Sequence, residues 1–346
     1  MKKVLSMALA VCMMLTMAAC SNGTKGNPTA SNPDPSVSNG SSPSGSSNPT
    51  PAVDYPTKTI KLICPWSAGG GSDQICRAVA TVAEKYLGQP VVVENRDGSG
   101  GVIGITEASR AANDGYTFVL ATTGVFLTQP ILSDVSYTLD SFEGVAKVST
   151  DEICIVVSAD CPANNIAELA ELYKGKALNA TGNAAGSLME LLSYDVYEQA
   201  GIDVNMVQFS GGASECISAL LGGHIEAIAV HPYEVKSNVE GGTLKILGVT
   251  GPDKLEWSPD TQTFAEQGID TLFNVQKAFF IPAGTDPAII EVLVDAFKQI
   301  YSDPDFLKLA ENMSLNLTPL YGEDVKAAYQ EQMDACYDKA AALIGK

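Results

Sequence analysis

Two spacings of apolar residues divide the chain from residue 60 onward into predicted strands and helices. Ile60, Leu62 and Cys64 alternate along one face of a segment, and Ile63 makes its other face apolar as well. This pattern predicts a strand in a buried sheet. Pro65 ends the strand because proline cannot donate a ladder hydrogen bond. After a short turn the apolar residues recur at helical spacing instead: Ile75, Val79, Val82, Ala83 and Tyr86.

The turn between this strand and this helix has the composition of an anion-binding loop. Its three glycines let the backbone approach a ligand closely, and Ser72 or Asp73 can cap the helix. The free N–H groups and the positive dipole end of the helix face the loop. The spacing fits neither a dinucleotide fingerprint nor a P-loop, and a turn that only joins strand to helix is the alternative. The candidate ligand-binding residues are Trp66, Ser67, Ala68, Gly69, Gly70, Gly71, Ser72 and Asp73.

The alternation of strands and helices continues along the chain. Strands are predicted at residues 91–94 and 116–121, with a second glycine-rich turn and a short helix between them. A βαβαβ order indicates a parallel, doubly wound sheet, whose ligands lie beyond the C-terminal ends of the strands. Thr122 and Thr123 follow one such strand, so we include them among the ligand-binding candidates.

A second unit of the same kind starts after a predicted strand at residues 153–158. Two further strands, at residues 177–180 and 204–208, each lead through a loop of small residues into a helix. Two α/β units with such loops would form a cleft that can hold both ends of a small dianion. The candidate residues of these loops are Thr181, Gly182, Asn183, Gly186, Ser187, Phe209, Ser210, Gly211, Gly212 and Ala213.

The N-terminus predicts export from the cytoplasm. Two lysines precede an apolar run at residues 4–17 that is too short to span a membrane, and Met17-Ala18-Ala19-Cys20 is similar to a bacterial lipobox. Residues 1–20 are therefore predicted to be a lipoprotein signal peptide with Cys20 lipidated, and an ordinary secretory signal is the alternative. Residues 21–54 are rich in Ser, Asn, Gly and Pro and predict a disordered tether.

Charge and cysteine content narrow the function classes. The formal net charge of −19 argues against binding to nucleic acid or to anionic lipid. Six cysteines follow Cys20, and an oxidising exterior permits disulfides, with Cys154 and Cys161 closest in sequence. Unbridged, buried thiols are the alternative. No cysteine spacing is typical of a zinc site, so no metal is expected. The remaining cysteines are Cys64, Cys76, Cys216 and Cys336.

A set of motifs in fixed order resembles the Bug family, the extracytoplasmic solute-binding proteins of tripartite tricarboxylate transporters. The resemblance runs from Tyr55 to the C-terminus. It rests on Tyr55-Pro56, Pro65-Trp66-Ser67-Ala68-Gly69-Gly70-Gly71-Ser72-Asp73, Gly88-Gln89-Pro90-Val91-Val92-Val93-Glu94-Asn95-Arg96, Gly98-Ser99-Gly100-Gly101 with Gly104, Asp114-Gly115-Tyr116-Thr117, Leu221-Gly222-Gly223-His224-Ile225-Glu226 and Pro282-Ala283-Gly284-Thr285.

The resemblance implies two doubly wound α/β domains that close by a hinge, as in type II periplasmic binding proteins. The first domain would comprise residues 55–156 and 278–346, and the second residues 157–277. It further implies a small organic carboxylate of the di- or tricarboxylate class as ligand, and membrane permease subunits as partners. A monomer anchored by its lipid to the extracytoplasmic face of the cell membrane is expected, with no cofactor.

Some residues depart from the family pattern, so the identity of the ligand does not follow from the resemblance. Ser210 stands where members often have Lys, and Leu188-Met189 stands near a position where many have His. Glu226 replaces a frequent Asp, and Ala184 replaces a glycine.

The alternative classes are a surface lipoprotein enzyme or an adhesin on the same scaffold. The chain has two histidines. His224 lies in a predicted turn, whereas His231 directly follows a strand and is a ligand-binding candidate at the cleft mouth, with a capping or packing role as the alternative. No serine-hydrolase elbow or zinc-protease motif is present. Asp73 could act as a general base, but its position favours capping. We therefore expect a binding protein and not an enzyme.

Overall fold

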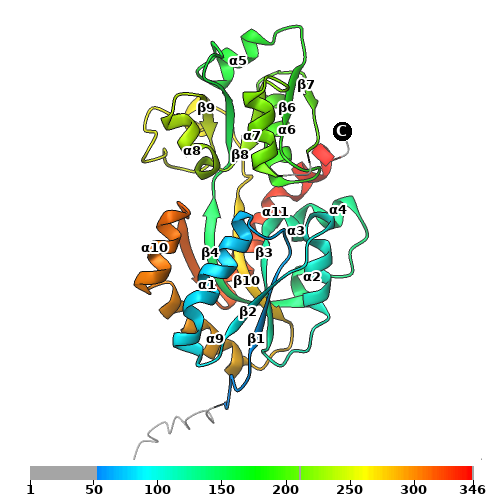
Figure 1. The fold of residues 1–346 in the computed structure, drawn as a ribbon. Helices are drawn as coiled ribbons and strands as arrows, with labels where there is room; N and C mark the ends of the chain where they lie inside the picture. Colours follow the sequence, from blue (N-terminus) through cyan, green and yellow to red (C-terminus); the bar gives the residue numbers. More distant parts are fainter. Residues whose placement is uncertain (1–52, 210–211, 345–346) are drawn as a thin grey trace, which may run out of the picture. The chain divides into compact units, whose positions relative to one another are not determined.

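Two β-sheets organise the residues that the computed structural model describes, which are residues 53–209 and 212–344 (Figure 1). The signal peptide, Cys20, almost all of the predicted tether, Ser210 and Gly211 lie outside the described residues. The first sheet has the strand order β11-β4-β10-β3-β1-β2, and the second has the order β7-β6-β8-β5-β9.

The strand that leads into the glycine loop, β1, lies in a parallel part of the first sheet. β1 pairs in parallel with β2 and β3, whereas β10 runs antiparallel between β3 and β4. The sheet is therefore mixed rather than wholly parallel. Its strands are β1 (Ile60–Cys64), β2 (Val91–Asn95), β3 (Thr117–Thr122), β4 (Phe142–Asp151), β10 (Val275–Pro282) and β11 (Leu317–Tyr321).

Helices cover both faces of the first sheet. The predicted alternation in β1 is confirmed, since Ile60, Leu62 and Cys64 join one apolar core and Ile63 joins another. The first core is closed by α1 (Gly71–Leu87), α9 (Pro287–Ile300) and α10 (Pro304–Asn312). The opposite core is closed by α2 (Val102–Ser109), α3 (Thr123–Leu127) and the first half of α11 (Glu323–Ile344).

The second sheet repeats this layered arrangement. β6 pairs in parallel with β7 and β8, and β5 runs antiparallel to β8 and β9. Its strands are β5 (Cys154–Ser158), β6 (Leu178–Thr181), β7 (Val204–Met206), β8 (Ala227–Val230) and β9 (Leu244–Val249). One face is covered by α5 (Ile166–Leu172) and α6 (Leu188–Gln199), and the other by α7 (Ala213–Leu221) and α8 (Pro232–Glu240).

Short elements complete the described part of the chain. They are α4 (Gln129–Leu132) and the 3-10 turns η1 (Ser99–Gly101), η2 (Leu139–Ser141) and η3 (Ala265–Gln267). Among the described residues, no helix combines the length and the apolar character that crossing a membrane requires. The six cysteines of this part of the chain are free thiols, and all but Cys161 are buried.

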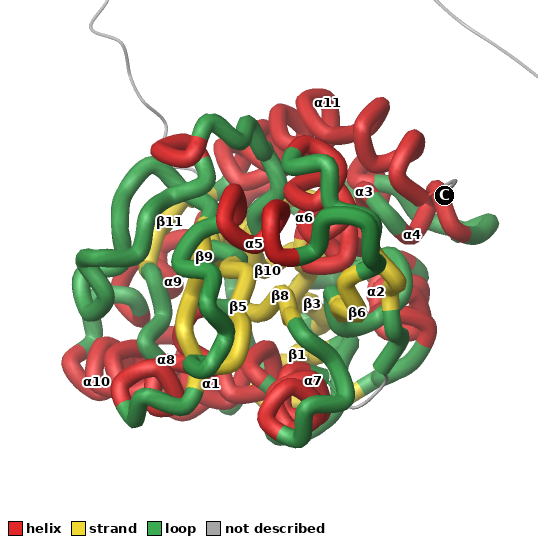
Figure 2. The backbone as a smooth tube through the Cα atoms, turned by 90° about the horizontal axis from the view of Figure 1, so that it is seen from above, coloured by secondary structure: helices red, strands yellow, loops and turns green. Residues whose placement is uncertain are grey.

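The first sheet and its helices form the first lobe, and the second sheet and its helices form the second lobe. Three segments connect these two lobes. The chain leaves the first sheet at Asp151, enters the second at Cys154, and returns between β9 and β10. The expected domain limits at residues 156 and 278 thus fall inside β5 and β10. The third connection is α11, which packs beside α3 with its first half and beside α6 with its second half (Figure 2).

Candidate functional site

The loop between β1 and α1 presents an uncapped helix N-terminus. α1 begins at Gly71, and its N-cap residue is Gly70, which has no side chain to accept from the N–H groups of the first turn. Gly69 has a φ of +84°, which favours glycine at this position. The predicted capping by Ser72 or Asp73 is wrong, because both residues lie inside the helix. The consequence is a helix end whose N–H groups are available to an anion.

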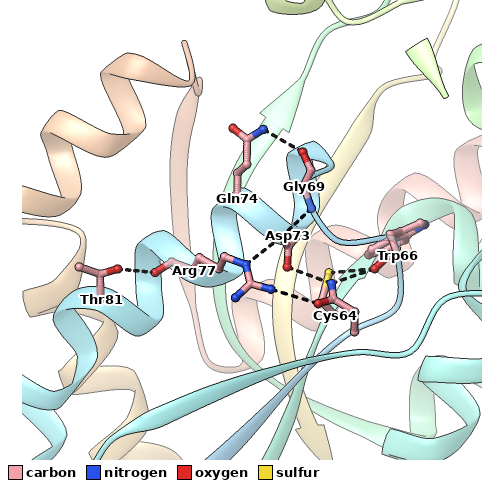
Figure 3. A network of polar contacts seen from close by, with 8 residues as sticks. Cys64, Trp66, Gly69, Asp73, Gln74, Arg77 and Thr81 are labelled. Atoms are coloured by element: carbon pink, nitrogen blue, oxygen red, sulfur yellow. Dashed lines mark hydrogen bonds and ion pairs between the residues drawn. The ribbon is translucent and has the colours of Figure 1, made fainter. Parts of the chain in front are cut away.

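Asp73 supports the loop from beneath (Figure 3). Its carboxylate accepts hydrogen bonds from Gly69 N at 2.8 Å, from Arg77 Nε at 2.8 Å and from Asn95 Nδ2 at 2.9 Å. Asn95 Nδ2 also donates to the carbonyl of Trp66 at 3.0 Å, which fixes the start of the loop. Burial alone would raise the pKa of Asp73, but these hydrogen bonds and the Arg77 charge outweigh it and lower the pKa. Asp73 is therefore a buried, ionised support.

The other residues of this loop divide between packing and exposure. Trp66 is half-buried and packs against both cores of the first lobe. The hydroxyl of Ser67 bonds the carboxylate of Asp97, while Ala68 and the three glycines are exposed. Gly104 in α2 lies so close to Pro65 that a Cβ there would be 2.8 Å from the proline Cβ. The loop is consequently held at its base and open at its tip.

The two threonines after β3 have different surroundings. Thr122 is the half-buried N-cap residue of α3 and makes no side-chain cap bond. Thr123 is fully buried, donates from its hydroxyl to Gln332 Oε1 at 2.9 Å and accepts from Gln276 N at 3.2 Å. Its hydroxyl is thus used by α11 and β10, which argues against the predicted role of Thr123 in binding a ligand. Thr122 keeps its place as a candidate.

A protein carboxylate occupies the loop before α6. Ser187 caps this helix by accepting from Glu190 N, and its hydroxyl donates to the carbonyl of Gly182 at 2.5 Å. Glu190 folds back into the loop, where its side chain accepts from Gly186 N at 2.5 Å and from the side-chain amide of Gln208. A second anion at this helix end would face the charge of Glu190. Of the two anion-binding positions predicted in the second lobe, the one at the N-terminus of α6 is therefore disfavoured.

The other predicted residues of the second lobe surround this loop. Thr181 is buried, and its hydroxyl accepts from Asn183 N at 3.1 Å. Phe209 is half-buried and packs on the core beneath α7. Gly212 is the N-cap residue of α7, which starts at Ala213 and has no side-chain cap. Unlike α6, α7 thus begins without a side-chain cap, as α1 does in the first lobe.

His231 is buried at the N-cap position of α8. Its backbone N–H donates to Glu234 Oε2 at 2.9 Å, and its Nδ1 lies 2.8 Å from the carbonyl oxygen of Glu152 in the crossover between the lobes. The carbonyl requires Nδ1 to carry a proton, so the imidazole is oriented by the crossover. Its ring stacks on Tyr233 with 5.3 Å between the ring centroids. His224, by contrast, is exposed in its turn, as expected.

Sequence reasoning missed two polar residues: Tyr233, which lies near the uncapped end of α1, and Lys277, which lies near Tyr233. Tyr233 Oη is 3.1 Å from the place where a Cβ on Gly71 would lie. Lys277 lies in β10 opposite Thr122, is buried, and forms an ion pair with Asp151. Burial would lower the pKa of Lys277, but the charge of Asp151 outweighs it and raises the pKa. A lysine within the apolar run of β10 was the available sequence signal.

Two α/β lobes joined by crossover strands, with glycine loops beyond the parallel strands, define a hinged solute-binding protein of the periplasmic type. A family model described as the tripartite tricarboxylate transporter family receptor matches residues 75–341. The protein BugT of Bordetella pertussis is 30% identical over 259 residues, which cover 72% of this chain and 78% of BugT. The chain belongs to this family of receptors, which includes the Bug proteins.

Solved structures agree with this assignment. A TctC solute-binding protein from Polaromonas, solved without ligand, is 29% identical, covers 84% of this chain and 99% of its own, and has a TM-score of 0.71. The periplasmic binding protein BugD is 27% identical, with coverage of 84% and 99% and a TM-score of 0.73. Two structures at 21% identity share the fold: MatC of Rhodopseudomonas palustris with bound malate, at a TM-score of 0.70, and Rpa4515 of R. palustris with adipate, at 0.72.

Proposed function

We propose that this protein captures a small organic carboxylate and delivers it to the permease of a tripartite tricarboxylate transporter. The observation that carries the proposal is the uncapped N-terminus of α1 behind a glycine loop held in place by Asp73. Backbone N–H groups at such a helix end bind anions without a cationic side chain. The malate and adipate bound by MatC and Rpa4515 support a carboxylate ligand.

The ligand would lie between the lobes, with one carboxylate at the N-terminus of α1. Its other end would meet the loops before α6 and α7, where Glu190 disfavours a second negative charge at the N-terminus of α6. Hinge motion at the crossovers would close the lobes over the ligand. No cofactor is needed for this capture, and a monomer suffices.

Isothermal titration calorimetry tests the ligand class. We expect the chain lacking residues 1–53 to bind at least one member of a panel of malate, adipate, succinate and citrate. A Kd near 1 μM would correspond to about −8 kcal/mol, which several charge-assisted hydrogen bonds can supply. A nucleotide and a hexose serve as controls. Binding of a control without binding of any carboxylate would contradict the proposal.

We also propose that the protein is held on the extracytoplasmic face of the cell membrane by a lipid on Cys20. The relatives are receptors of exported type, which supports an extracytoplasmic location, and the lipobox supports the anchor. Cys20→Ala should leave the precursor unprocessed or release the protein from the membrane fraction. The anchor is rejected if this variant is processed and fractionates as the wild type does.

A further inference from the structure

Tyr233 joins the second lobe to the N-terminus of α1 in the first lobe. It is the second residue of α8, whereas Gly71 is the first residue of α1. A Cβ on Gly71 would lie 3.1 Å from the Tyr233 hydroxyl oxygen, a distance tighter than ordinary carbon–oxygen contact. The phenol therefore reaches the helix end at which the proposed function places a carboxylate.

Neighbours on two sides fix the orientation of the Tyr233 ring. One face stacks on His231, with an angle of 12° between the planes, and His231 is itself bound to the carbonyl of Glu152. The ammonium nitrogen of Lys277 lies 5.8 Å from the centre of the Tyr233 ring. Lys277 is in turn held by its ion pair with Asp151. A ring held in this way is preorganised and loses little freedom when a ligand binds.

Lys277 also determines which way the phenol can donate. An ammonium group has donors only, so it can approach the hydroxyl oxygen of Tyr233 only through an oxygen lone pair. The proton of Tyr233 is then directed away from the ammonium group. Burial raises the pKa of Tyr233 while the charge of Lys277 opposes the rise, and the net shift is upward. At neutral pH the phenol is therefore a donor.

We propose that Tyr233 is a ligand-contacting residue of the second lobe, donating its O–H to the carboxylate that lies at the N-terminus of α1. This inference rests on the proposed function. Lys277 is the positioning residue, because its ammonium group polarises the phenol and orients its proton. The contact explains how one ligand can hold both lobes, since α1 and α8 belong to different sheets. It favours an anionic carboxylate over a neutral ester or amide.

Tyr233→Phe tests the contact because it keeps the ring and its stacking on His231. We expect affinity for the best-bound member of the malate, adipate, succinate and citrate panel to fall about tenfold to a hundredfold. The melting temperature without ligand should stay unchanged, whereas the stabilisation by ligand should shrink. Tyr337→Phe, at an exposed tyrosine of α11, is the matched control and should bind as the wild type does.

A double-mutant cycle distinguishes direct contact from a general structural effect. Gly71→Ala adds a methyl group against the hydroxyl of Tyr233 and should weaken binding in the wild-type background. In the Tyr233→Phe background the same change should cost much less, because the oxygen that it displaces is absent. If the wild type binds no member of the panel, the proposed function and this inference both fail. If it binds and Tyr233→Phe binds within twofold of it, this inference alone fails.

Discussion

At the residue scale, carboxylates of the protein itself accept hydrogen bonds from the loop before α1 and from the loop before α6. Asp73 takes the N–H of Gly69, and Glu190 takes the N–H of Gly186. Each of these carboxylates shapes its loop before any ligand arrives. In the described part of the chain the N-cap residues of α1 and α7 are glycines without a capping side chain, so these helix ends and neutral hydroxyls such as that of Tyr233 are the candidate donors. Recognition by such short, neutral donors suits a strongly acidic chain, which offers little long-range attraction to an anion.

Asp73→Asn should both loosen the loop and weaken ligand binding. One of its three donors would face an amide N–H₂ group instead of an oxygen, so the free energy of unfolding should fall by roughly 1–3 kcal/mol. The pKa of Asp73 is lowered in the folded state, so its stabilisation is present above about pH 4 and lost as the pH falls through the folded pKa. Urea unfolding from pH 7 to pH 3 should show the gap between wild type and variant narrowing. A constant gap would contradict this role.

At the element scale, α11 is the least local part of the fold. Val325 and Tyr329 belong to a core of the first lobe, whereas Ala340 and Leu343 belong to a core of the second lobe. Lys339 strengthens the second attachment through an ion pair of 2.7 Å with the buried Asp195 of α6. The helix α11 therefore supports both lobes, although the family resemblance placed all of its residues in the first domain.

Ala340→Asp should destabilise the protein although it lies near the C-terminus and far from the site loops in sequence. It places a charge in the core between α11 and α6, and an uncompensated buried charge costs about 3–5 kcal/mol. Ala342→Asp, at an exposed position of the same helix, is the matched control and should change stability little. Thermal unfolding followed by circular dichroism measures both. Equal stability of the two variants would show that the second half of α11 does not support the fold.

At the scale of the whole molecule, a buried ion pair lies where the chain crosses between the lobes. Asp151 is the last residue of β4 before the crossover, and Lys277 is the third residue of β10 after the return. The two strands are antiparallel neighbours, so the pair links both crossovers on the side of the first sheet. Burial would raise the pKa of Asp151, but the charge of Lys277 outweighs it and lowers the pKa.

Lys277→Met should strongly destabilise the protein at neutral pH because it leaves Asp151 buried without a partner. The expected loss is about 3–5 kcal/mol, and Asp151→Asn combined with Lys277→Met should recover part of it. In the Lys277→Met variant the pKa of Asp151 in the folded protein should rise. The folded variant should therefore be more stable at low pH and lose stability as the pH increases. Urea unfolding at pH 7 and pH 5 should show a smaller gap at pH 5. A gap that grows on acidification would contradict this account.

The periodic parts of the fold and the glycine loop before α1 could be predicted from sequence. Ile60, Leu62 and Cys64 face one core and Ile63 faces the other, because strand geometry alternates side chains whatever lies beyond them. The glycine loop before α1 was found for a similar reason, since a buried strand, a proline, three glycines and a helical repeat are all local signals. The family motifs added the two-lobed arrangement with its hinge.

The chain by itself therefore determined the alternating strands and helices of residues 60–121 and the loop at which a ligand is expected, because spacing and backbone preference act over a few residues. The strands β4, β10 and β11, which make the first sheet mixed, came only from the structure. Only the tertiary structure decided which side chains do what in the site. Asp73 supports the loop through Asn95, Thr123 bonds Gln332, and Tyr233 reaches Gly71. These partners lie tens to hundreds of residues apart in sequence. A buried polar group takes its role from the donor or charge that the fold brings to it, and sequence spacing carries no record of that choice.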